Sequence, residues 1–298
     1  MQKAKKARAR VVLPKVSLPH RLARLLMLCL VPQLAFQTHP LLANPTGGTV
    51  AAGSALIEST GNTMTITTSD RAVIHWQGFS IGAGETTQFV QPSSSSAVLN
   101  RVTSGDASHL LGNLQANGQV YLLNPNGIFI GNGAVINVGS FLATTANIAD
   151  TDFMKGGNLA FSGATDSAII NQGSITATAG DVMLLARTVK NTETGTISAP
   201  QGTVAMAAGT QFYLKKDEIG AMRVEVKPEA VPGFKGETGV DNSGLLQAMR
   251  VQLEADGNLY GLAINQQGLV RATGVSRGAD GTIVLSAPGG TIRQSGTM

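Results

Sequence analysis

Cysteine is almost absent from this sequence, since Cys29 is the only one in 298 residues. It lies in an N-terminal segment that we expect to be removed, which leaves no thiol for a disulfide bond or for metal binding. Aromatic residues make up 4% of the chain and charged residues 13%, whereas glycine occurs 36 times. This composition disfavours a thick conventional core and favours short strands separated by many turns.

Acidic residues are missing from residues 1 to 43, which hold eight Lys and Arg side chains. The apolar run that follows the basic part, "LLMLCLVPQLAF" at 25 to 36, is shorter than the roughly 20 residues that span a bilayer. A basic region, a short apolar run and a small residue form the layout of a secretory signal. We predict a signal peptide over 1–43 that is cleaved after Ala43, with Ala35 as the alternative site. A retained membrane anchor is the competing interpretation.

A net positive charge is also missing once this segment is set aside. The remainder holds 14 Lys and Arg against 18 Asp and Glu. A basic patch for phosphate groups is therefore not supported, and we expect no nucleic-acid partner.

Helical periodicity over more than about ten residues is absent after residue 44, and strand-like alternation takes its place. Three segments share one pattern of Asn, Gly, an aliphatic residue, a Gly-bearing turn and Val: "INQGSITATAGDVMLLA", "KNTETGTISAPQGTVAMAAG" and "INQQGLVRATGVSRGADGTIVLSA". Asn171 and Asn191 lie 20 residues apart. A repeat of this length, built from short strands and turns, predicts the stacked coils of a parallel β-helix.

We interpret residues 121–141, "YLLNPNGIFIGNGAVINVGSF", as one such coil. Its corners need positive φ, which Gly adopts freely and Asn tolerates, and Asn side chains at equivalent corners can form hydrogen-bonded ladders. The candidate inward-facing residues are Ile128, Ile130, Val135, Ile136 and Phe141.

The pattern breaks over about 211–263, where "QFYLKKDEIGAMRVEVKPEAVPG" is more charged. We expect an extra-helical hairpin excursion there, with a possible helical turn after residue 243, and a return of the coils at Asn265. The last coil ends without a polar cap, and an uncovered strand edge is adhesive. We therefore expect the natural protein to continue or this chain to be a truncated form.

An ordered set of phrases carries a resemblance to a known family. They are "TGGTVAAGSA", "IHWQGFSIGAGETTQFVQPSSSSAVLNRV", "GNLQANGQVYLLNPNGI" and "GSFLATT". Residues 44–298 resemble the N-terminal secretion domain of the filamentous haemagglutinin family, the exported partners of two-partner secretion. The family's Asn-Pro-Asn-Gly-Ile motif falls on Asn124, Pro125, Asn126, Gly127 and Ile128. A second family motif, Asn-Pro-Asn-Leu, is absent upstream.

The resemblance implies a right-handed parallel β-helix with an N-terminal cap, exported unfolded through the periplasm of a Gram-negative-type envelope. A dedicated outer-membrane β-barrel transporter with periplasmic recognition domains would bind it, and it would then fold at the cell surface or outside. The implied role is a non-enzymatic secretion and folding-nucleation domain of an adhesin-type exoprotein, and we expect a monomer. Host-surface carbohydrate or protein would be bound mainly by downstream repeats. The motif has two interpretations, transporter contact and the shaping of a corner.

Enzymatic readings are weaker. "GFSIG" at 78–82 matches a hydrolase nucleophile elbow, but the residues after Ser80 read as strand rather than helix. Parallel β-helices that act on polysaccharides are the main alternative, and they need clustered carboxylates. The densest acidic groups here, Asp150 with Asp152 and Asp217 with Glu218, do not repeat at coil spacing.

Metal and cofactor sites are likewise not indicated. After residue 43 the histidines are His75 and His109, whose separation has no ligand spacing. Trp76 could stack on a sugar, but Ile74, Trp76, Phe79 and Ile81 fit an early strand and the cap of the core better. We predict no catalytic residue, no metal and no cofactor.

Overall fold

The computed structural model describes residues 44–298 except 217–221, 229–235 and 274–280. Contacts divide the chain into two units, Met1–Leu41 and Leu42–Met298, and every described residue belongs to the second unit. The predicted signal peptide and its cleavage after Ala43 lie outside the described residues. No described helix is both long and apolar enough to cross a membrane.

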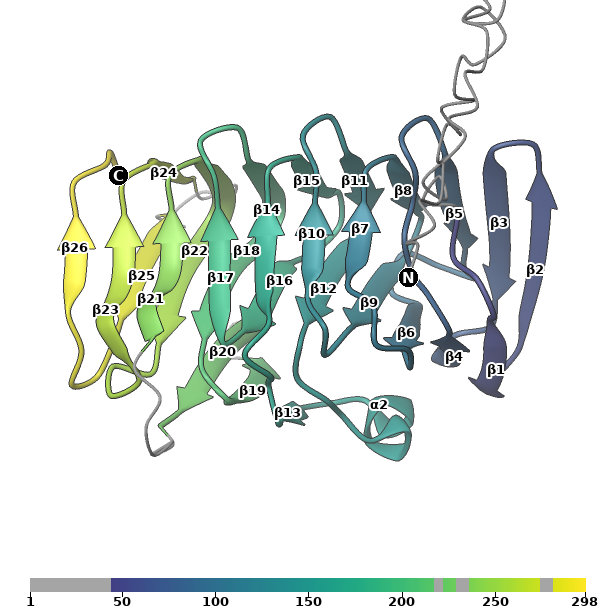
Figure 1. The fold of residues 1–298 in the computed structure, drawn as a ribbon, viewed down its shortest axis with the longest axis horizontal. Coiled ribbons are helices and arrows are strands. Elements are labelled where there is room, and N and C mark those ends of the chain that lie inside the picture. The colour runs from purple at the N-terminus through teal and green to yellow at the C-terminus, as the bar shows by residue number, and fades with distance from the viewer. Residues whose placement is uncertain (1–43, 217–221, 229–235, 274–280) are drawn as a thin grey trace, which may run out of the picture. The chain divides into compact units, whose positions relative to one another are not determined.

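Each coil of the second unit consists of three short strands joined by tight corners. One coil runs through β7 (Ser108–Leu110), β8 (Asn113–Ala116) and β9 (Gln119–Leu123), and the next through β10 (Ile128–Ile130), β11 (Val135–Val138) and β12 (Ser140–Thr144). Equivalent strands of the two coils pair in parallel. Figure 1 shows the chain rising through β10, passing behind through β11 and advancing towards the C-terminus, so the winding is right-handed. The expected right-handed parallel β-helix is confirmed.

Stacking of the coils produces three faces, which we call the first, second and third face in chain order. The first face is a seven-stranded sheet: β7, β10, β14 (Ala168–Asn171), β17 (Thr188–Asn191), β21 (Gly236–Asn242), β23 (Tyr260–Gln266) and β26 (Ile292–Gln294). The second face holds β3 (Thr63–Thr68), β5 (Thr86–Val90), β8, β11, β15 (Ser174–Ala177) and β24 (Leu269–Ala272). The third face holds β4 (Ala72–Trp76), β6 (Ala97–Val102), β9, β12, β16 (Val182–Ala186) and β25 (Thr282–Ser286). Strands β18 (Thr196–Ala208) and β22 (Leu245–Ala255) run through the corner and belong to both the second and third faces.

Aliphatic side chains line the interior in rows, one residue from each coil. Ile128, Ile130, Ile136 and Phe141 are buried, as predicted. Val135 is 44% exposed, so its predicted inward position is wrong. Neighbouring residues of a strand point to opposite sides of the sheet. In β11 the side chain of Ile136 points into the core, so that of Val135 points outwards.

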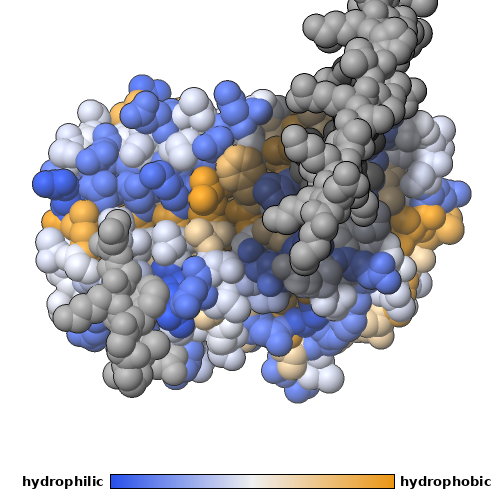
Figure 2. All heavy atoms as spheres, viewed as in Figure 1, coloured by the Kyte–Doolittle hydropathy of each residue, from blue (hydrophilic) through white to orange (hydrophobic). Residues whose placement is uncertain are grey.

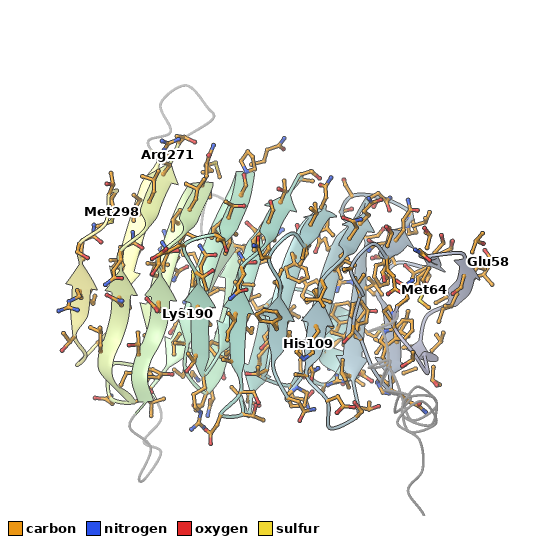
Figure 3. The ribbon with its side chains drawn as sticks, turned by 45° about the horizontal axis from the view of Figure 1, so that its top comes forward. Glu58, Met64, His109, Lys190, Arg271 and Met298 are labelled. Atoms are coloured by element: carbon orange, nitrogen blue, oxygen red, sulfur yellow. The ribbon has the colours of Figure 1, made fainter. Side chains whose placement is uncertain are left out.

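The N-terminal end is closed by antiparallel strands. β1 (Thr49–Ala52) pairs with β4, and β2 (Ala55–Thr60) pairs with β3. Inside this end the Trp76 ring packs edge-on against Phe79, and the Trp76 indole N–H donates to Asn100 Oδ1 at 2.9 Å. Ile74, Trp76, Phe79 and Ile81 are all buried, which confirms their expected place in the capped end of the core. In Figure 3, Glu58 and Met298 mark opposite ends of the stack.

Two excursions leave the coils and pack against the outside of the third face. The first contains α2 (Asp150–Lys155), the only helix among the described residues, and β13 (Leu159–Ser162). The second is the hairpin of β19 (Gln211–Lys216) and β20 (Met222–Lys227), and β13 joins it to form an antiparallel sheet. These elements cover a second hydrophobic core that includes Leu99, Phe153 and Phe212.

The hairpin was predicted, but its expected extent of about 211–263 is too long. By β21 the chain has returned to the first face, where Val240 pairs with Val189 of β17. β22 and β23 then form regular coil strands in place of the expected helical turn. The cause is visible in β22, where the buried Leu246 and Ala248 alternate with the half-buried Leu245, Gln247 and Met249. This alternation gives the segment a strand period rather than a helical one.

A ladder of buried amides runs along the corner after the first face. Asn171 Nδ2 donates to Asn191 Oδ1 at 2.8 Å, and Asn191 donates to Asn242 at 2.8 Å. Asn242 in turn donates to Gln266 Oε1 at 2.6 Å. The expected laddering is confirmed, but its member in the later coil is Gln266 and not Asn265. Asn265 lies one position earlier and donates outside the core to Asp241.

The outward row of the first face is polar in its later coils. Lys190 Nζ lies 3.4 Å from an Asp241 carboxylate oxygen, and Asn265 bonds the same carboxylate. Figure 2 shows a largely hydrophilic surface over these strands. Along each of these strands, aliphatic residues that point inwards therefore alternate with polar residues that point outwards, as a half-buried sheet requires.

Candidate functional site

The corner from Asn124 to Ile128 joins β9 on the third face to β10 on the first face. The Gly127 N–H donates to the Asn124 carbonyl at 3.1 Å, which closes a four-residue turn. Gly127 has φ of 104°, and a Cβ at this position would lie 3.1 Å from the Ala168 carbonyl oxygen of the next coil. Only glycine meets both conditions without strain. Ile128 then turns into the core.

The Asn124 side chain is fully buried and uses both ends of its amide. Its Nδ2 donates to the Asp106 carbonyl at 3.0 Å and to Ser108 Oγ at 2.9 Å, in the preceding coil. Its Oδ1 accepts a hydrogen bond from the Asn126 backbone N–H at 2.9 Å. An aspartate could not donate these bonds, and a serine would be too short to make them all.

Asn126 and Pro125 tie the same turn to its neighbours on either side. Asn126 Nδ2 donates to the Ser104 carbonyl at 2.7 Å. The exposed Pro125 offers its carbonyl to the hydroxyl of Thr165, which belongs to the excursion that follows β12. The five motif residues are therefore gathered in one corner, and this corner fastens three segments of the chain together.

A second polar cluster fastens α2 to the early coils. One Asp150 carboxylate oxygen lies 2.6 Å from an Arg101 guanidinium nitrogen on β6, and the other lies 3.1 Å from His75 Nε2 on β4. Arg101 also donates to the Ile148 carbonyl at 2.7 Å. Arg71 donates to the Phe153 carbonyl at 2.7 Å and lies over the Phe153 ring. We call the group of Asp150, Arg101 and His75 the clasp. In the sequence, Asp150 stands out only as part of an acidic pair with Asp152.

The residues weighed for catalysis do not assemble into a hydrolytic site. Ser80 Oγ accepts a hydrogen bond from the His109 backbone N–H at 3.0 Å, and Ile81 continues as an extended bridge to Leu110. His75 lies on the third face and His109 on the first, where its ring packs against Phe129 at 5.8 Å. Figure 3 labels His109 on that face. Within the described part of the chain, no group of three His, Cys, Asp or Glu side chains could hold a metal ion.

The two acidic pairs have different outcomes. Asp150 belongs to the clasp, and Asp152 pairs with the exposed Lys155 along the same helix at 3.3 Å. Asp217 and Glu218 lie outside the described residues.

The winding, the capped N-terminal end and the Asn-Pro-Asn-Gly corner define a β-helical secretion domain. The TPS secretion domain family matches residues 42–298, and the chain belongs to this family. TPS denotes two-partner secretion, in which an outer-membrane transporter recognises the secretion domain of an exported protein. The chain is thus a secreted or cell-surface protein that crosses the outer membrane.

Comparison with individual proteins agrees with this assignment. The chain is 32% identical over 253 residues to the heme/hemopexin-binding protein of Haemophilus influenzae, a match that covers 82% of the chain and 27% of that protein. It is 31% identical to the HMW1 secretion domain of Haemophilus influenzae, with a TM-score of 0.65 over 84% of the chain and 64% of that structure. The filamentous hemagglutinin secretion domain shares the fold at 20% identity, with a TM-score of 0.54 over 84% of the chain and 99% of that structure. The chain spans about a quarter of the length of the curated relative.

Proposed function

We propose that this chain is the export and folding-nucleation unit of an adhesin-type exoprotein. We further propose that the transporter binds Asn124–Ile128 before the chain folds. The observation that carries the second part is the complete burial of Asn124. A transporter cannot contact a side chain that is enclosed between two coils. Recognition of this residue would therefore use the extended chain, for example by addition of a strand to a periplasmic domain of the transporter.

The local character of the contacts supports nucleation. Equivalent strands of successive coils pair with each other, and the antiparallel cap closes the first coil from the N-terminal side. An early coil can thus form before later ones leave the transporter, and each new coil adds its inward side chains to an existing core. Where no excursion intervenes, each such pairing closes a loop of about one coil, as for Asn171 and Asn191, which lie 20 residues apart, so the entropy cost of closing it stays limited.

The clasp adds a further step to coil-by-coil folding, which is the docking of α2 on the early coils. Residues 147–150 must have emerged before Arg101 and His75 of the earlier coils gain their carboxylate partner. Docking of α2 also places the Phe153 ring against Tyr121 on the outside of the third face. We infer that the early coils are consolidated once α2 docks, which would hinder the chain from sliding back.

The protein is proposed to be non-enzymatic. The matched family is a secretion domain family, and the residues considered for hydrolysis are used for packing and corners. A protein of this family that extends beyond the secretion domain would bind its host-surface carbohydrate or protein through further repeats. The Haemophilus influenzae relative named for heme and hemopexin extends far beyond the matched part.

Recognition can be separated from folding by a matched pair of variants. Asn124→Ala removes a buried amide inside the motif, and Asn171→Ala removes one from the ladder outside it. Each variant is co-expressed with the cognate transporter, and its secreted amount is compared with its free energy of unfolding after refolding in vitro. We expect Asn124→Ala to reduce secretion well beyond the level that its stability loss explains, using Asn171→Ala as the reference. Equal secretion at equal stability would show that the motif acts only on the fold.

A further inference from the structure

A cavity of about 450 Å³ lies on the outside of the third face. Its floor crosses β9, β12, β16 and the later part of β18, and the hairpin of β19 and β20 forms one wall. Ser94 and Ser95 stand at its rim, and Met249 also contributes to its lining. The volume falls within the range of roughly 300–1,000 Å³ that is usual for small-ligand sites. Apart from Tyr121, which also contacts Phe153 of α2, the residues of the motif corner, the clasp and the amide ladder do not line this cavity.

One side of the cavity is a row of polar side chains, one from each of four successive coils. Gln119 pairs with Ser140 in the parallel register. Asp181 follows in the next coil, and its N–H donates to Ser140 Oγ at 3.2 Å. Thr203 follows in turn, and its N–H donates to Asp181 Oδ1 at 2.7 Å. Because neighbouring coils lie about 4.8 Å apart, this row presents hydrogen-bonding groups at a regular spacing.

Beside the polar row runs an apolar one. Tyr121, Leu142 and Met183 occupy paired positions on β9, β12 and β16, two residues further along each strand. Leu214 and Met222 of the hairpin face the same space. Burial raises the pKa of the Tyr121 hydroxyl to about 12, so this phenol stays neutral and can donate a hydrogen bond.

The polar row retains hydrogen-bonding capacity. Gln119, Ser140 and Asp181 are half-buried, whereas Thr203 is fully buried. Burial raises the pKa of the Asp181 carboxyl, while the Thr203 backbone N–H opposes this shift. Half-buried polar side chains that line a cavity can form hydrogen bonds with a ligand that enters it.

The charge and the strand pairing of the cavity limit what it can hold. Among the described residues, the lining contains one carboxylate, Asp181, and one ammonium group, Lys216, so these residues do not favour a polyanion or a polycation. β9, β12 and β16 are each hydrogen-bonded to a strand on both sides. A peptide therefore finds no free strand edge on the floor to pair with, and only side chains are offered for binding.

We propose that this cavity binds a short, neutral oligosaccharide. Hydroxyl groups along the sugar chain would bond to Gln119, Ser140 and Asp181, and the apolar faces of its rings would lie against the half-buried Tyr121 and Met222. Carboxylate, amide and hydroxyl groups in a row suit vicinal hydroxyls, and the parallel apolar row suits the C–H faces of pyranose rings. This site belongs to the secretion domain itself, in addition to any binding by further repeats, and it does not depend on the transporter proposal.

The test uses the full secreted chain on an array of neutral, sulfated and sialylated oligosaccharides and extended peptides, followed by calorimetry with the neutral sugar that binds best. Asp181→Asn and Tyr121→Phe are expected to weaken that binding by roughly tenfold or more, because each removes a hydrogen-bonding group that a bound sugar would use. Tyr121→Phe keeps the ring packed against Phe153 and serves where Asp181→Asn fails to fold. Glu193→Gln, an exposed change in another polar groove, is the matched control and should leave binding unchanged.

The proposal is overturned if no neutral oligosaccharide binds. It is equally overturned if the array selects peptides or anionic sugars instead. Binding of a neutral sugar that is unchanged in folded Asp181→Asn and Tyr121→Phe proteins would place the site elsewhere, and would also overturn it.

Discussion

Asn191 Nδ2 donates a hydrogen bond to Asn242 Oδ1 at 2.8 Å, although the two residues lie 51 positions apart in the sequence. The chain between them leaves the coils as the hairpin of β19 and β20 and then returns in register. The ladder therefore fixes which part of the chain forms the next coil after an excursion. Register in a parallel β-helix rests on this corner as well as on the aliphatic rows.

Replacement of Asn191 by Ala should destabilise the fold strongly. It leaves the buried Asn242 Oδ1 without this donor and removes one of the two acceptors of Asn171 Nδ2, the other being the Gly173 carbonyl, at about 1–3 kcal/mol for each lost bond. Chemical denaturation of the refolded chain measures the loss. Gln294→Ala is the control, because the exposed Gln294 bonds only to Gly296 and should change stability by less than about 0.5 kcal/mol. Equal losses in the two variants would show that the ladder is not a source of stability.

Two neighbouring positions on β11 give a direct test of the winding. Val135 is 44% exposed and Ile136 is fully buried. We expect Ile136→Ala to cost about 2–5 kcal/mol and Val135→Ala about 0.5 kcal/mol or less, because only the first opens a cavity in the core. The denaturation midpoints of the two variants measure these losses of stability. A larger effect at Val135 would mean that the strand faces the other way.

The clasp predicts different effects for two aspartates on the same helix. Asp150→Asn weakens a charge-assisted bond to Arg101, whose side chain is 16% exposed, and should cost about 1–3 kcal/mol. Asp152→Asn removes a pair whose side chains are 58% and 75% exposed, and should cost less than about 0.5 kcal/mol. Thermal unfolding of both variants provides the comparison. Equal losses of stability in the two variants would show that the clasp does not stabilise the fold.

The half-buried carboxyl group of Glu254 joins the hairpin to β22 and makes the stability of the fold depend on pH. Glu254 Oε1 accepts from the Val226 N–H at 2.7 Å, and burial raises the pKa of Glu254 above its ordinary value of 4.5. The folded state then holds this proton to higher pH than the unfolded chain. The contribution is complete below pH 4.5 and is lost as the pH rises through the raised pKa.

Stability measured across this interval in the wild type and in Glu254→Gln isolates the effect. The free energy of unfolding of the wild type, relative to the variant, should fall as the pH rises from about 4 towards neutrality. Other titrating groups are common to both proteins and cancel in the difference. A difference that is constant or that rises with pH would contradict the assignment.

Much of the architecture could be predicted from the sequence because it repeats. The Asn-to-Asn spacing of 20 between Asn171 and Asn191 indicates a coil, and the turn residues indicate its corners. The resemblance of the Asn124–Ile128 phrase supplied the family. Where prediction failed, the signal was local and ambiguous. Val135 and Ile136 are both aliphatic, so composition could not decide which faced inwards, and only the strand register separates them.

The excursions show what a repeat cannot reveal. β22 carries Arg250, Gln252 and Glu254 on its outer side because the hairpin covers that surface and β20 bonds to two of these side chains. In the sequence these residues made a coil strand look like part of the charged excursion. The pairing of Asp150 with Arg101 is a long-range contact, and no periodic pattern in the sequence indicates it. The cavity likewise depends on the position of β19 and β20 beside the third face, which no repeat predicts.

Co-expression of this chain with its cognate transporter tests the central claim most directly. The secreted chain is collected from the medium and examined for resistance to proteolysis, with a transporter-deficient strain as the reference. We predict that the chain reaches the medium only when the transporter is present, and that the collected chain is protease-resistant over the coils from β1 to β26. Equal release without the transporter would contradict the account.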